Sequence, residues 1–198
     1  MTLQTHTAFS DPVFESQQAF RAIMDAMARP GSMQHVAIDI SPPEAMPLAA
    51  AAAILALCDF ETALWVCPSI TNANAIADYC AFHTGAMRAK TKDHAQFALV
   101  DVTTNPLRLG GFAQGIAEYP DRSTTIICMA PSLIGGQTRT LSGPGIQTTA
   151  NLFIEGLPGD FDAQWAANHE SFPLGVDMVF CSGASLIAMP RSTRILEA

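Results

Sequence analysis

The residues of this chain with the clearest chemical potential lie close together between Thr138 and Ile146. Arg139 supplies a guanidinium, Ser142 supplies a hydroxyl, and a Gly-Pro-Gly turn containing Gly143 and Gly145 follows at once. Glycine reaches backbone angles that strain other residues, so this turn can expose amide N–H groups beside the arginine. An anionic ligand such as a phosphate would suit that arrangement. The same pattern also occurs where a tight turn joins two strands, and the residues alone leave both interpretations open.

Two further charged residues stand at the ends of apolar runs. Asp177 precedes one run, and Arg191 follows a proline at the end of the next. A cluster of Arg139, Arg191 and the turn amides would suit a phosphate or an acidic partner surface, but a surface ion pair is the favoured interpretation of each arginine taken singly. Asp177 can bind magnesium or pair with an arginine, and pairing is the favoured interpretation. The candidate ligand- or partner-binding residues are therefore Arg139, Ser142, Gly143, Gly145, Asp177 and Arg191. No catalytic residue is identified.

The familiar catalytic motifs are absent from the sequence. After Gly145 the chain reads Ile-Gln-Thr-Thr, without the lysine of a nucleotide-binding P-loop. Ser142 is not part of a Gly-x-Ser-x-Gly motif, and no histidine is near it in sequence. The two lysines, Lys90 and Lys92, lie in a polar segment that is a poor place for a Schiff-base amine. We therefore expect neither nucleotide hydrolysis by this chain alone nor a lysine-bound cofactor.

The metal-binding motifs are incomplete as well. Cys80 and His83 are three residues apart on an expected helix, but a structural zinc site usually shows two such pairs. His169-Glu170 begins like a zinc-protease motif, yet Ser-Phe-Pro follows and the proline ends the helix before a second histidine. Core packing is the favoured interpretation of Cys80, and we expect no metal site.

Composition and charge narrow the class of protein. The chain has 198 residues, which suits one domain spanning residues 1–198. It is 49% hydrophobic and only 14% charged, whereas about 25% charged residues is typical. This weakly polar composition indicates a subunit covered by partners. The net charge of −8 argues against a nucleic-acid partner, since neutralising phosphates needs surplus lysine and arginine.

The sequence also bears on location. The most apolar run, Ala45 to Cys58, is shorter than the roughly 20 residues of a membrane-spanning helix. The N-terminal segment lacks a basic region followed by an apolar one, so we expect no signal peptide. The five cysteines are an odd number without a Cys-x-x-Cys pair, as expected for reduced core residues. These features predict a cytoplasmic protein with no membrane partner.

The elements that must position the candidate residues alternate between helices and strands. Helices are expected from Pro12, capped by Asp11, to Pro30-Gly31, over 47–58, from Asn72 or Asn74 to about His83, and over 160–169. The first is indicated by Val13, Phe20, Ile23, Met24 and Met27 at helical spacing. Strands are expected at 32–38, 62–67, 96–102, 123–129, 136–141, 148–154, 177–181 and 185–189. The strands at 96–102 and 123–129 are apolar almost throughout, which predicts burial on both faces. The expected architecture is an α/β, three-layer α/β/α sandwich with a mixed sheet.

Five segments taken together resemble the PhnH family, the H subunits of the bacterial carbon–phosphorus lyase system. They are Phe-Arg-Ala-Ile-Met-Asp-Ala-Met-Ala-Arg-Pro-Gly (20–31), Glu-Tyr-Pro-Asp-Arg-Ser-Thr (118–124), Leu-Ser-Gly-Pro-Gly-Ile (141–146), Phe-Pro-Leu-Gly-Val-Asp (172–177) and Pro-Arg-Ser-Thr (190–193). The last departs from the expected Pro-Arg-Thr-Thr by one serine. The segments occur in order, so the resemblance covers nearly the whole chain.

The resemblance implies a cytoplasmic protein of phosphonate catabolism. It would act with subunits G, I and L, which replace the adenine of MgATP with a phosphonate to give a ribose 1-phosphonate 5-triphosphate, and it would join subunits G, I and J in a core complex. The family fold resembles the large domain of pyridoxal-phosphate-dependent transferases but lacks the cofactor. The resemblance implies no catalytic residue in this family. Two hypotheses remain: an assembly subunit without a complete active site, and a nucleotide- or phosphonate-binding subunit that uses Arg139 and the Gly143–Gly145 turn. A homodimer of the isolated chain is also left open.

Overall fold

A seven-stranded mixed sheet lies at the centre of the computed structural model, which describes residues 6–103 and 107–196. Its strand order is β1 (Met33–His35), β11 (Ser185–Met189), β10 (Asp177–Ser182), β7 (Thr125–Met129), β4 (Phe97–Asp101), β2 (Ala63–Val66) and β3 (Met87–Arg88). The strands from β10 to β3 run parallel, whereas β11 is antiparallel to both of its neighbours. Apolar β4 and β7 are central and buried, as their sequences predicted, and β10 beside β7 is buried as well.

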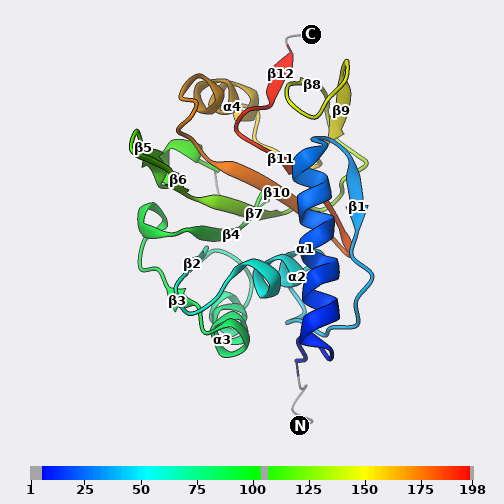
Figure 1. Ribbon diagram of the computed structural model, residues 1–198, viewed down its shortest axis with the longest axis vertical. Coiled ribbons are helices and arrows are strands. Elements are labelled where there is room, and N and C mark those ends of the chain that lie inside the picture. Colours follow the sequence, from blue (N-terminus) through cyan, green and yellow to red (C-terminus); the bar gives the residue numbers. More distant parts are fainter. Residues whose placement is uncertain (1–5, 104–106, 197–198) are drawn as a thin grey trace.

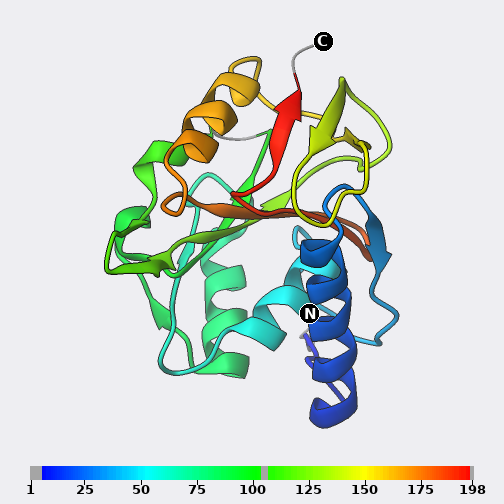
Figure 2. The same ribbon diagram turned by 45° about the horizontal axis from the view of Figure 1, so that its top comes forward.

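Two different layers cover the faces of this sheet (Figure 2). Helices α1 (Pro12–Ala28), α2 (Leu48–Leu57) and α3 (Ala73–Thr84) lie on one face. The other face carries α4 (Phe161–Glu170) and a three-stranded sheet of β12 (Arg194–Leu196), β8 (Thr138–Ser142) and β9 (Ala150–Phe153). The expected α/β class with a mixed sheet is confirmed, but the second outer layer is part helix and part sheet. The two expected strands around the Gly-Pro-Gly turn do pair with each other, and they form this separate sheet rather than joining the central one.

The remaining short elements lie at the edge of the molecule. Strands β5 (Gln114–Ile116) and β6 (Tyr119–Ser123) form a hairpin, and two single 3₁₀ turns, η1 and η2, occupy Lys92–His94 and Leu109–Gly111. This hairpin, β3 and β12 were not expected from the sequence. Strands β3, β5 and β12 have only two or three residues, which is too short for an alternation pattern to develop, and β6 is polar and contains Pro120.

Helix α1 begins and ends where the sequence predicted. The Asp11 carboxylate accepts a hydrogen bond from the Phe14 amide at 3.3 Å, and Pro12 occupies the first turn. The buried residues of α1 are Ala19, Ala22, Ile23 and Ala26, and α1 packs on α2, whose buried residues are mainly alanine (Figure 1). Small side chains let the two helices approach closely. The larger apolar residues whose spacing predicted this helix do not all face the core: Ile23 is buried, whereas Val13, Phe20 and Met24 are exposed.

Candidate functional site

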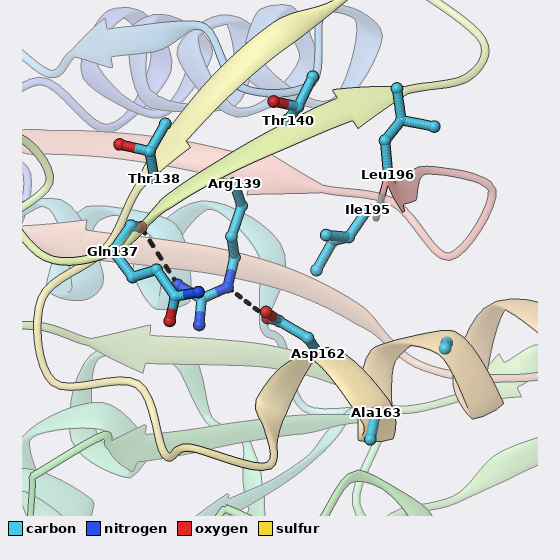
Figure 3. Close-up of a pocket in the computed structure, with 9 residues that line it drawn as sticks. Gln137, Thr138, Arg139, Thr140, Asp162, Ala163, Ile195 and Leu196 are labelled. Atoms are coloured by element: carbon cyan, nitrogen blue, oxygen red, sulfur yellow. Dashed lines mark hydrogen bonds and ion pairs between the residues drawn. The ribbon is translucent and has the colours of Figure 1, made fainter. Parts of the chain in front are cut away.

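Arg139 lies in a pocket between β8 and α4 (Figure 3). Its Nε donates to the Asp162 carboxylate, and one terminal nitrogen donates to the carbonyl oxygen of Gln137 at 3.3 Å. The pocket has a volume of about 380 Å³ and is closed on one side by Ile195 and Leu196 of β12. The guanidinium thus reaches from the small sheet to the first turn of α4.

The two partners of this ion pair differ in their exposure to solvent. The Arg139 side chain is 5% exposed, whereas that of Asp162 is 40% exposed. The guanidinium carbon lies 5.5 Å from the centre of the fully buried Phe161 ring, which adds a cation–π attraction. Asp162 lies in the first turn of α4, where the helix dipole favours a carboxylate. The pair therefore ties β8 to α4, and the pocket is open to solvent on the carboxylate side.

The Gly-Pro-Gly turn packs against backbone. Gly143 and Gly145 have φ values of +139° and +82°. A Cβ added to Gly145 would lie 2.0 Å from the carbonyl oxygen of Ala28, at the end of α1, and one added to Gly143 would lie 3.0 Å from that of Ser192. Ser142, the last residue of β8, is partly buried and pairs with Arg194 of β12. The glycines allow the turn to approach two other segments more closely than a side chain would permit.

Arg191 forms a second network with Asp177. Its backbone N–H donates to the Asp177 carboxylate at 2.8 Å and its Nε donates at 3.1 Å. The guanidinium also donates to the carbonyl oxygens of Pro120 and Pro173 and to Ser123 Oγ. The side chains of Arg191 and Asp177 are 14% and 16% exposed. The favoured pairing of Asp177 with an arginine is confirmed, and the arginine is Arg191.

Helix α4 holds residues 191–194 through three ring nitrogens of two side chains. Trp165 Nε1 donates to the carbonyl oxygen of Thr193 at 2.8 Å. His169 Nδ1 lies 2.9 Å from the carbonyl oxygen of Arg191, and Arg194 Nε donates to His169 Nε2 at 2.7 Å. Because Nε2 accepts, the neutral tautomer with the proton on Nδ1 satisfies both bonds. A second pocket, of about 300 Å³, lies beside Trp165, His169 and Arg194.

The five sequence segments that carry the resemblance meet around residues 190–193. Gly145 of the 141–146 segment packs on the 20–31 segment, and Gly143 packs on Ser192. Arg191 binds residues of the 118–124 and 172–177 segments. These segments therefore serve first to join α1, β8, β10 and the hairpin.

The candidate residues do not form a single site. Arg139 and Arg191 are held by different carboxylates, and the Gly143–Gly145 turn contacts the end of α1 and Ser192 rather than the Asp162 carboxylate. Sequence reasoning missed Asp162, Trp165 and His169, which are the α4 partners of these networks. Asp162 lies two residues after the expected helix start at Asp160. An acidic residue in the first turn of a helix was the only sequence signal that could have marked Asp162.

The cysteine thiols are poorly placed to act as nucleophiles. All five are buried, and none of them forms a disulfide bond. Burial raises the pKa of the Cys58 and Cys80 thiols to about 12, and the pKa of Cys128 and of Cys181 is also raised by burial. Within residues 6–103 and 107–196, no three His, Cys, Asp or Glu side chains gather as they would around a metal ion. In the same ranges no helix has the length and apolarity to cross a membrane.

Comparison with known proteins then decides the family. Residues 7–196 match the family of bacterial phosphonate metabolism proteins, PhnH. The chain belongs to this family. It is 39% identical over 188 residues to the alpha-D-ribose 1-methylphosphonate 5-triphosphate synthase subunit PhnH of Rhizobium meliloti (strain 1021), with 95% of this chain and 94% of that protein covered. It is also 28% identical over 180 residues to the putative C-P lyase subunit protein HtxG of Stutzerimonas stutzeri, covering 90% of this chain and 85% of that protein. The resemblance inferred from the five segments is confirmed.

Proposed function

We propose that this chain is the PhnH component of a ribose 1-methylphosphonate 5-triphosphate synthase in bacterial phosphonate catabolism. The observation that carries the proposal is the 39% identity to the synthase subunit of R. meliloti over nearly the full length of both chains. The chain then acts as one PhnH domain over residues 1–198. Its partners are subunits G, I and L in transferring a phosphonate to MgATP with release of adenine, and G, I and J in a core complex.

Within that complex, we propose that the chain assembles the synthase rather than supplying a complete active site. The engagement of both candidate arginines supports this role, because Asp162 and Asp177 neutralise Arg139 and Arg191 inside the chain. The packing of the glycine turn on α1 supports it too. MgATP is then a substrate of the complex, and the chain has no cofactor of its own. The buried cysteines are consistent with a reducing cytoplasm.

The fold is proposed to be a cofactor-free relative of the large domain of pyridoxal-phosphate-dependent transferases. A mixed sheet with layers on both faces supports the proposal. So does the position of the two lysines, since Lys90 is exposed and the Lys92 ammonium lies 4.9 Å from the centre of the Phe112 ring. An aromatic ring stabilises the charged ammonium, whereas a Schiff base needs a neutral amine.

A ligand-binding subunit is the second candidate, and one observation favours it. Arg139 lines a pocket of about 380 Å³ and its carboxylate partner is 40% exposed, so an incoming anion could replace Asp162. If the chain binds a ligand in this way, the ligand contacts Arg139 but not the Gly143–Gly145 turn. Calorimetry of the isolated chain with MgATP and with methylphosphonate separates the two roles: binding that is lost in Arg139→Gln supports the second.

A growth experiment tests the proposed function. Deleting the gene should abolish growth on methylphosphonate as the sole phosphorus source while leaving growth on phosphate unchanged, and a plasmid copy should restore it. Unimpaired growth of the deletion strain on methylphosphonate would refute the proposal.

A further inference from the structure

Helix α1 carries large apolar side chains on the side that faces solvent. Val13, Phe14, Phe20 and Met24 are 74%, 70%, 47% and 49% exposed. The buried side of the same helix is made mainly of alanine. A helix that only covers a core shows the opposite distribution, with its large apolar residues inside.

Three of these side chains lie in line along the helix. Val13, Phe20 and Met24 follow one another at spacings of seven and four residues, which places them in a single row along the helix. This is the spacing at which one helix packs along another. Strand β1, which contains the exposed Met33, lies beside α1 at the edge of the central sheet (Figure 1).

The charges on α1 indicate what this surface contacts. Glu15 accepts hydrogen bonds from the backbone N–H groups of Ser10 and Asp11, and Asp25 pairs with Arg29 at 2.9 Å. Both acids of the helix are therefore engaged. Arg21 lies one turn beyond Gln17 beside the apolar row, and within residues 6–103 and 107–196 no hydrogen bond or ion pair holds it. A complementary surface would be apolar with a carboxylate opposite Arg21.

A second copy of this chain fits that description poorly. A symmetric pair of α1 helices would bring each row against itself, with residue i contacting j and j contacting i. Arg21 lies within one helical turn of the middle of the row, so the two arginines would come close together with no free α1 carboxylate between them. Like charges at such a contact oppose association.

We propose that the α1 surface formed by Val13, Phe20, Arg21 and Met24 docks an apolar helix of another subunit of the core complex, with a carboxylate facing Arg21. The inference rests on the proposed function, because that function supplies the partner. Side chains of this kind, aromatic and methionine with one arginine, are those enriched at the centre of protein interfaces.

The test is an affinity titration of the purified chain into the complex of its partner subunits G, I and J. Phe20→Glu should weaken binding by about 30-fold or more, the scale of an interface hot spot. Arg21→Glu should weaken it by about tenfold through like-charge repulsion with the partner carboxylate. Phe82→Glu is the matched control, since Phe82 is even more exposed but lies on α3, and its binding should stay within about twofold of the original chain. Circular dichroism establishes that each variant is folded.

The outcomes separate the inference from the proposed function. If the unmodified chain does not bind the partner subunits, the proposed function fails. If it binds and Phe20→Glu binds equally well, only the docking surface is refuted. The docking surface is also refuted if Phe20→Glu turns a dimer of this chain into a monomer while its affinity for the partner subunits is unchanged, because a second copy would then occupy α1.

Discussion

Replacing Gly145 by alanine tests whether the Gly-Pro-Gly turn is a packing element. The added Cβ would lie 2.0 Å from the carbonyl oxygen of Ala28 and 3.0 Å from its carbonyl carbon. Neither atom belongs to a flexible side chain, so the end of α1 or the turn itself must move. The φ of +82° is also strained for alanine.

The magnitude follows from three contributions. The left-handed backbone costs alanine about 1–2 kcal/mol. Overpacking of this kind typically costs about 1–3 kcal/mol. The smaller freedom of alanine in the unfolded chain offsets about 0.4–1 kcal/mol of this. The free energy of unfolding should therefore fall by about 1–5 kcal/mol, with a centre near about 3 kcal/mol that corresponds to roughly 6–12 °C in Tm for a domain of this size.

The assay is urea unfolding followed by tryptophan fluorescence and circular dichroism. Gly159→Ala is the matched control, because no atom lies within 4 Å of its added Cβ and its φ is not in the left-handed region. The control should change the free energy of unfolding by less than about 0.5 kcal/mol. Equal stability of the two variants would refute the packing of the turn on α1. The turn amides would then be free to bind an anion.

Three further perturbations test other parts of the structure. Asp177→Asn leaves the mostly buried Arg191 guanidinium without its countercharge, so the free energy of unfolding measured in urea should fall by about 3 kcal/mol; a loss below about 1 kcal/mol would contradict a buried pair. Because burial raises the pKa of Cys58 and Cys80 to about 12, neither thiol should react with a disulfide reagent at pH 8 until urea unfolds the chain, and rapid reaction in the native protein would be inconsistent with their burial. Desolvation lowers the pKa of His83 in the folded chain, so the unfolded state binds the proton more readily and stability should fall as pH drops below about 6.5; His83→Gln should flatten this part of the pH profile measured by thermal unfolding, and an unchanged profile would count against the assignment.

The helices and strands that have local sequence signals, such as a helix cap or a continuous apolar run, were predicted correctly. The Asp11 cap and Pro12 marked the beginning of α1, and continuous apolar runs marked the central strands β4 and β7. Strand β12 has too few residues for a pattern, and its partner β8 lies more than 50 residues earlier in the chain. The division between the central sheet and the small sheet was not predictable for the same reason.

The candidate residues show a similar limit. The pairing of Asp177 with an arginine could be expected from charge alone, but the identity of Arg191 as its partner depends on β10 and β11 lying side by side. Arg139 was recognised as unusual, whereas Asp162 could not be connected to it because the two residues come from different elements. Helical spacing identified α1 correctly but could not say which of its two apolar sides is buried. That choice is made by the alanines of α2, against which only small side chains pack closely.

The central claim, that this chain is required by the synthase without supplying its chemistry, is tested most directly by adenine release in a reconstituted system. Subunits G, I and L are incubated with MgATP and methylphosphonate, with and without this chain. The double variant Arg139→Gln, Asp162→Asn removes both charges of the pocket pair, so it leaves no buried charge without a partner. Adenine release should depend on the chain and should be restored by the folded double variant to within about twofold of the original. Full activity without the chain, or a variant that assembles with its partners yet releases no adenine, would contradict the account.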